Sequence, residues 1–202
     1  ELKTRWFCSF TNKMKPHRII FHSLMCQNPL WKSQNISFNN INQELGLKPE
    51  QSHYLQNIKE TKLTAPHEPV FDHFTHSFYI GPSVKTFQQS AICVVGESQF
   101  FPNNIFITEK TTNPIVNCLP VIVYGQKHHM HTLEELGIDI FRDLFGDFAY
   151  DNITDMEKRV IACSDLCKKF LNKDISYYQD WLKDNKERLL SNARLLIRQV
   201  EK

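Results

Sequence analysis

The chain has 202 residues, of which 41% are hydrophobic and 23% are charged, and its formal net charge is +2. These values are typical of a globular protein with one well-buried core. The small net charge argues against a protein that coats nucleic acid without sequence preference. No apolar stretch reaches the length that a membrane-spanning helix needs.

The amino-terminal part predicts two strands and two helices. The apolar run 6–10 is typical of a short buried strand, and Pro16 suits the first turn of the helix that follows. Residues 35–40 predict a second short strand, and residues 49–59 predict a helix opened by a proline. The Pro- and His-rich stretch 61–78 lacks periodicity, so we expect a long irregular surface loop there.

From residue 82 onward, strands and helices are predicted to alternate. The expected elements are a helix at 83–90, a strand at 91–95, a helix at 108–116, a strand at 120–124, a helical turn at 132–136 and helices at 155–171 and 175–200. Gly137 is expected to end the helical turn. The last helix carries an apolar stripe, which we expect to pack partly against another domain.

This alternation predicts an α/β fold, with a Rossmann-like parallel sheet covered by helices on both faces. We divide the chain into a Rossmann-like domain over residues 1–172 and a carboxy-terminal amphipathic helix over 173–202. Ligands of such sheets bind beyond the carboxyl ends of the strands. We therefore expect the functional residues to follow the predicted strands.

Six cysteines lie mostly within apolar runs, which favours buried, reduced thiols in a reducing compartment. Cys163 and Cys167 share one face of a predicted helix, but no second pair stands beside them to complete a metal site. The histidines at 128, 129 and 131 follow a predicted strand, and we expect them in an exposed loop at the mouth of the ligand cleft. His67, His73 and His76 are expected in the solvated loop 61–78 rather than in a metal cluster.

The segment 106–115 carries the most specific chemistry. Thr108 is a good N-cap, and the helix start behind it offers N–H groups and a positive dipole end to a diphosphate. Lys110 could reach the same phosphates, and the Glu109 carboxylate suits ribose hydroxyls. The same residues also fit an ordinary capped helix with both charges in solvent.

Two motifs resemble the α1,3-fucosyltransferase family. The sequence 106–110 (FITEK), followed by a helix and a Pro-Val-Ile-Val strand, resembles that family's Tyr-hydrophobic-Thr-Glu-Lys signature. The segment 93–98 (CVVGES) resembles the strand and Glu-Asn-Ser before it. Near the start, 7–10 (FCSF) followed by an Asn and by 18–21 (RIIF) resembles the family's Phe-Cys-x-Phe strand and Arg-x-x-Phe helix.

The later part, from Thr108 to Phe141, resembles fucosyltransferase-like proteins of viruses and bacteria. The resemblance spans roughly residues 5–170. Two departures weaken the GDP-fucose pattern: Phe106 stands where the family has Tyr, and Asn113 stands where the viral relatives commonly have Lys.

The resemblance implies the carboxy-terminal, donor-binding half of a GT-B type glycosyltransferase. By position, it assigns donor binding to Arg18, Glu109 and Lys110, with Thr108, Phe106 and Glu97 beside them. It implies a nucleoside-diphosphate sugar as donor, GDP-sugar above others, and no essential cofactor; a divalent metal is compatible but not required.

The implied partner molecules are the sugar donor and a hydroxyl acceptor: a glycan, lipid, protein or modified base. The catalytic base would belong to an amino-terminal domain or to a partner chain. The alternative is a non-catalytic Rossmann-like binding or structural module of a larger assembly, such as a virus particle. Whether Arg18, Glu109 and Lys110 converge on one cleft distinguishes the two.

Overall fold

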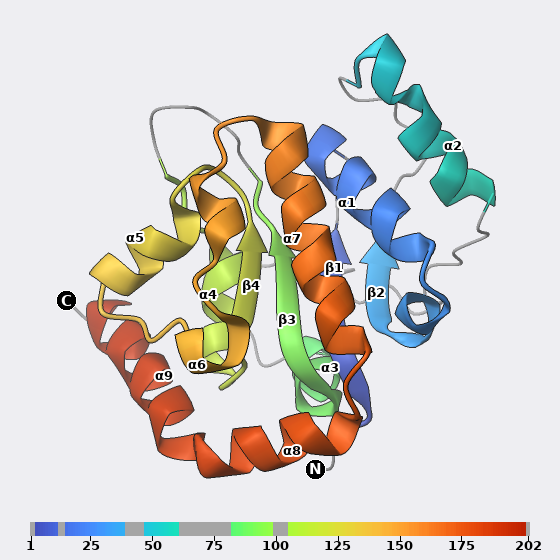
Figure 1. Cartoon of the computed structure of the whole chain (residues 1–202). Coiled ribbons are helices and arrows are strands. Elements are labelled where there is room, and N and C mark those ends of the chain that lie inside the picture. Colours follow the sequence, from blue (N-terminus) through green and yellow to red (C-terminus); the bar gives the residue numbers. More distant parts are fainter. Residues whose placement is uncertain (1–2, 12–14, 39–46, 61–81, 99–104, 201–202) are drawn as a thin grey trace.

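The computed structural model describes residues 3–11, 15–38, 47–60, 82–98 and 105–200 (Figure 1). Four parallel strands form one open sheet in the order β2-β1-β3-β4. The strands are β1 (Arg5–Thr11), β2 (Asn35–Phe38), β3 (Ser90–Gly96) and β4 (Val121–Tyr124).

Helices connect and surround these strands. The α-helices are α1 (Pro16–Cys26), α2 (Ser52–Glu60), α3 (Pro82–Gln89), α4 (Glu109–Val116), α5 (His129–Glu135), α6 (Arg142–Phe145), α7 (Met156–Leu171), α8 (Ile175–Asp184) and α9 (Lys186–Val200). Short 3-10 turns are η1 (Pro29–Ser33), η2 (Pro49–Gln51) and η3 (Ala149–Asn152).

The strand order places a change of direction between β1 and β3. From β1 the chain moves to β2 on one side, and from β3 it moves to β4 on the other. Because crossovers between parallel strands are right-handed, α1 and α4 must cover opposite faces of the sheet. Figure 1 shows α1 and α7 side by side in front of the sheet and α3 and α4 behind it. The crevice between the carboxyl ends of β1 and β3 is where such folds bind ligands.

The core is built on the two central strands and their helices. Every residue of β3 is buried, as expected of a strand covered on both faces. On the α1 side, the ring of Phe21 stacks on Tyr124 with 4.2 Å between centroids, and it meets Trp31 edge-on at 5.8 Å. Aromatic packing of this kind contributes beyond its buried area.

Most of the predicted elements are confirmed. All four strands are present, Pro16 opens α1, and Thr108 caps α4 with its side chain. Gly137 ends α5 as expected: its φ of +84° suits glycine, and its N–H donates to Glu134. The predicted loop 61–78, with His67, His73 and His76, lies outside the described residues.

The predicted helix over 175–200 is wrong as a single element. The structure divides it at Asn185 into α8 and α9, and Asn185 ends α8. Its side-chain amide donates to the Trp181 carbonyl. The apolar stripe of α9 packs on α4 of this same chain, with Leu189 and Ala193 buried.

The cysteines at 8, 26, 93, 118, 163 and 167 are all free thiols, and only Cys118 is partly exposed. Burial and the neighbouring Cys8 raise the pKa of Cys93. In the part of the chain that the structure describes, no helix is both long and apolar enough to cross a membrane.

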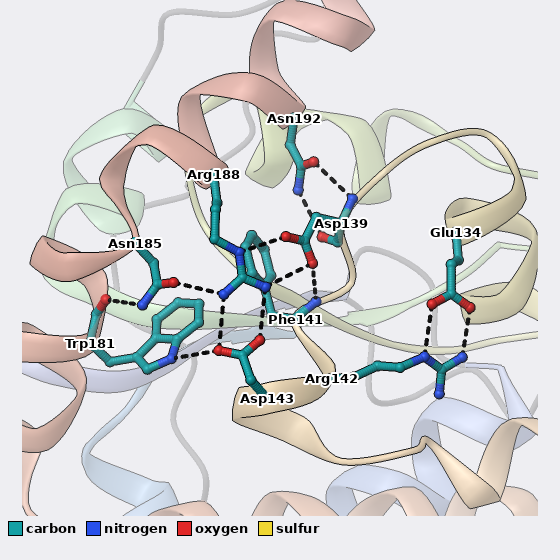
Figure 2. A network of polar contacts seen from close by, with 9 residues as sticks. All are labelled: Glu134, Asp139, Phe141, Arg142, Asp143, Trp181, Asn185, Arg188 and Asn192. Atoms are coloured by element: carbon teal, nitrogen blue, oxygen red, sulfur yellow. Dashed lines mark hydrogen bonds and ion pairs between the residues drawn. The ribbon is translucent and has the colours of Figure 1, made fainter.

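A polar network fastens α9 to the segment after α5, and Figure 2 shows its side chains converging on Arg188. The guanidinium pairs with Asp139 at 2.7 and 3.1 Å and with Asp143 at 2.8 and 2.9 Å. It also lies 5.0 Å from the ring centroid of Phe141. Trp181 donates to Asp143 at 3.3 Å. We call these five residues the C-terminal clasp.

Replacing the clasp arginine tests how much it stabilises the fold. We expect Arg188→Ala to lower the free energy of unfolding by about 1–2 kcal/mol, because two carboxylates lose a forked partner in a network. Chemical denaturation measures this. Arg198→Ala, an exposed position on the same helix, is the matched control and should change little.

The same variant carries a pH signature. The hydrogen bond and charge of Arg188 lower the pKa of Asp143 despite its partial burial. A carboxylate whose pKa is depressed on folding stabilises the protein above its unfolded value of about 3.9. The deficit of Arg188→Ala should therefore be full at neutral pH and shrink as the pH falls below about 4. A deficit that does not change with pH would contradict the ion pairing.

Candidate functional site

The first turn of α1 forms hydrogen bonds with the backbone of residues 96–98, where the chain leaves β3. Three successive carbonyls at residues 96–98 accept hydrogen bonds from this turn, and buried carbonyls need such donors. Arg18 donates from Nε and Nη2 to the first at 3.1 and 2.7 Å, and His17 donates from Nε2 to the second at 2.9 Å. Lys15 donates from Nζ to the third. The start of α1 is thereby locked onto the end of β3, across the change of direction in the sheet.

The side chain of Glu97 joins the same backbone to α4. Its carboxylate accepts from the N–H and Oγ1 of Thr108 at 3.1 and 2.8 Å, from Oγ1 of Thr111 at 2.6 Å and from the N–H of Ser98 at 3.0 Å. Glu97 is fully buried. A buried carboxylate is tolerated when donors surround it in this way. We therefore give Glu97 a structural role at the site.

Glycines stand at the end of β3 and directly after β4, where the space for a side chain is tight. A Cβ on Gly96 would lie 2.6 Å from the Tyr124 hydroxyl oxygen. The carbonyl of Gly125 accepts from Nε of the buried Arg159 at 3.0 Å, just as the carbonyl of Gly96 accepts from Arg18. Two buried arginines thus donate to the carbonyl that ends β3 and to the carbonyl that follows β4.

The start of α4 carries the exposed charges of the site. Thr108 accepts from the N–H of Lys110 at 3.2 Å, and its own N–H is taken by Glu97. The helix start therefore offers a ligand fewer unoccupied N–H groups than the sequence suggested. Lys110 pairs with Glu109, and the Glu109 side chain is 52% exposed.

Charges from both faces of the sheet act on one another here. Burial lowers the pKa of Arg18, while the nearby Tyr124 hydroxyl and the Glu97 and Glu109 carboxylates raise it. Burial favours a higher pKa for Glu109, but its hydrogen bond to Lys110 and the charges of Lys110 and Arg18 lower the value overall. The three residues that the sequence assigned to the donor, Arg18, Glu109 and Lys110, therefore lie within electrostatic reach at one edge of the sheet.

Arg18 differs from the other two because it is only 1% exposed. Its fork is used by the Gly96 carbonyl, so in this structure it contributes charge rather than an open hydrogen-bonding surface. Phe106 is the opposite case: its ring is 50% exposed, and its N–H donates to Gln126 Oε1 at 2.8 Å. An exposed aromatic residue thus lies three positions before Glu109 in the chain.

The expected exposed loop at residues 128–131 is wrong. His129 begins α5 and is fully buried, whereas His131 faces outward and pairs with Glu134 and Glu135. The reason is helical spacing, since His129 and Leu133 point inward together. Both ring nitrogens of His129 are buried and have no hydrogen-bond partner among the described residues, and burial lowers the pKa of His129 to about 4.

No family model, curated protein or solved structure matches this chain. Within the described residues, no three His, Cys, Asp or Glu side chains gather in a way that could hold a metal ion. A surface hollow of about 250 Å³ lies at the start of α5, lined by His128 and His131 together with residues such as Arg142 and Asp151. Arg18, by contrast, binds the Gly96 carbonyl at the end of β3, and Glu109 and Lys110 begin α4.

Sequence reasoning missed Lys15, His17 and Gln126 at this edge. The signal for the first two was present, because both flank Pro16 at the first turn of a helix that follows a strand. Gln126 gave no signal, since its bond to Phe106 joins two loops separated by 20 positions.

Removing the charge of Glu97 tests its central position. In Glu97→Gln, an amide would face several of the same donors, so we expect a loss of about 3 kcal/mol in the free energy of unfolding. Denaturant titration gives the value. Glu135→Gln, at an exposed position, serves as the control; equal stability of the two variants would contradict the role given to Glu97.

Three buried histidines predict steep acid sensitivity. Burial lowers the pKa of His22 to about 3 and of His129 to about 4, and burial with the charge of Arg18 lowers that of His17 well below its ordinary value. Below about pH 6.5 these three histidines become protonated in the unfolded chain but stay neutral in the folded chain. The free energy of unfolding therefore decreases as the pH falls. The slope should reach roughly 4 kcal/mol per pH unit between pH 6 and 5.

Denaturation midpoints measured from pH 7 to pH 5 check this slope. His129→Gln should remove about a third of it. The exposed His53 offers the control substitution His53→Gln, which should leave the slope unchanged. A stability that stays flat over this range would contradict the burial of neutral histidines.

Proposed function

We propose that this chain is the donor-binding domain of a glycosyltransferase that uses a nucleoside-diphosphate sugar, with a GDP-sugar favoured. The observation that carries the proposal is that Arg18, bound to the Gly96 carbonyl at the end of β3, interacts through charge with Glu109, which pairs with Lys110 at the start of α4. Open α/β sheets bind nucleotides at this place. The motif resemblance to α1,3-fucosyltransferases favours the GT-B arrangement, in which a second domain completes the active site.

Each exposed residue has a role in this proposal. Lys110 would contact the diphosphate, and Glu109 would accept hydrogen bonds from the ribose hydroxyls. Phe106, held at its backbone by Gln126, offers its ring for stacking on the base. Arg18 is a positioning residue, because it holds the Gly96 backbone by hydrogen bonds and adds positive charge from the protein interior.

The reaction would be an inverting transfer of the sugar. An acceptor hydroxyl oxygen forms a bond to the anomeric carbon, the bond from that carbon to the diphosphate breaks, and the acceptor proton passes to a base on another domain or chain. The developing charge on the diphosphate is stabilised by Lys110 and by the field of Arg18. Since these cations supply positive charge, a metal ion is not required.

The second candidate is a non-catalytic module, and a specific observation favours it. The fork of Arg18 is used by Gly96, the N–H of Lys110 is used by Thr108, and the Lys110 side chain is used by Glu109. A site whose groups are all engaged within the protein is also what a domain retained for its shape would have.

Thermal-shift titration with GDP, UDP and their sugar conjugates, with and without manganese, separates the two. At about a hundredfold excess over the dissociation constant, a true ligand should raise the melting temperature by roughly 5–10 °C. We expect this for GDP and its conjugates, and we expect Lys110→Ala to lose it. Lys186→Ala, an exposed lysine on α9, is the control. No shift with any nucleotide would favour the non-catalytic module.

A further inference from the structure

We propose that Glu109 makes this site select nucleotides over bare phosphates, by holding Lys110 until ribose hydroxyls occupy the carboxylate. This inference rests on the proposed function, and it adds a specificity role to a residue otherwise described only as a ribose contact. Glu109 would weaken the binding of bare phosphates as well as strengthen the binding of nucleotides.

The first support is the direct contact within the pair. Lys110 Nζ donates to Glu109 Oε1, and the side chains are 24% and 52% exposed. A ligand that approaches from solvent therefore meets an anion and a cation already joined. A bare phosphate would have to displace the carboxylate from Lys110 while lying beside its negative charge.

The second support is the reach of the Glu109 charge. It interacts with Arg18 as well as with Lys110, so one exposed carboxylate lowers the positive potential of two cations. Arg18 cannot compensate, since it is buried and donates to the Gly96 carbonyl. Lys15 is likewise engaged with the Ser98 carbonyl. Of these three cations at the starts of α1 and α4, Arg18 and Lys15 are thus engaged by carbonyls and Lys110 by the Glu109 carboxylate.

A ribose changes this balance without adding charge. Two neutral hydroxyls can donate to the Glu109 carboxylate and replace the hydrogen bond from Lys110. The freed ammonium group can then turn to the diphosphate of the same ligand. Binding of the two halves of a nucleotide is thus coupled, while pyrophosphate alone bears the full repulsion.

Isothermal titration calorimetry of the wild-type chain and of Glu109→Gln with inorganic pyrophosphate and with GDP tests this coupling. We expect Glu109→Gln to bind pyrophosphate about fivefold more tightly than the wild type, because a like charge is removed. The same variant should bind GDP roughly tenfold more weakly, because the charged acceptor for ribose is lost. The preference of the protein between the two ligands therefore shifts by about fiftyfold.

Added salt provides a second readout. The gain for pyrophosphate in Glu109→Gln should shrink as ionic strength rises, since it is electrostatic. Glu187→Gln on α9, whose side chain is 80% exposed, is the matched control and should bind both ligands as the wild type does.

The outcomes separate this inference from the proposed function. If GDP binds the wild type and Glu109→Gln weakens GDP and pyrophosphate alike, Glu109 is not selective and the inference fails while the function stands. If the variant binds both ligands more tightly, Glu109 does not contact ribose, and the inference also fails. If neither ligand binds either protein, the donor site itself is absent and both proposals fall.

Discussion

The fold depends on the hydrogen bonds that residues 96–98 accept where the chain leaves β3. Its carbonyls accept from the first turn of α1, and the carboxylate of Glu97 accepts from the first turn of α4. These helices lie on opposite faces of the sheet (Figure 1). One short segment therefore holds both layers together at the point where the strand order changes direction. Buried donors and acceptors of this kind are costly to leave unpaired, so they fix a single arrangement.

This constraint also determines which residues remain for a ligand. Arg18 and Glu97 are buried and form hydrogen bonds within the fold. Phe106, Glu109 and Lys110 lie at the surface of the protein. The buried Arg18 still acts on the exposed Glu109 through charge, because electrostatic interactions are strengthened away from water. A rigid buried layer beneath a small exposed set is what preorganised binding requires. At the proposed donor site, the exposed residues would contact the ligand and the buried residues would hold them in position.

Local signals in the sequence were sufficient for much of this. Pro16 and Thr108 mark helix starts by their own chemistry, and the apolar runs of β3 and β4 read directly as buried strands. The break at Asn185 was missed because the clasp around Arg188 joins distant segments (Figure 2). The burial of Arg18 was missed for the same reason, since it depends on a carbonyl 78 positions away. Contacts between residues far apart in the chain determine these two features, and the periodicity of a sequence does not predict such contacts.

The most direct test of the donor site is to map the backbone amides that respond to GDP by ¹⁵N–¹H NMR. The account predicts that the largest shifts fall on residues 96–98 and 106–111, which follow β3 at the change in strand direction. Shifts centred on the hollow near Arg142 and Asp151, or spread without a centre, would contradict a donor site at the carboxyl ends of β1 and β3.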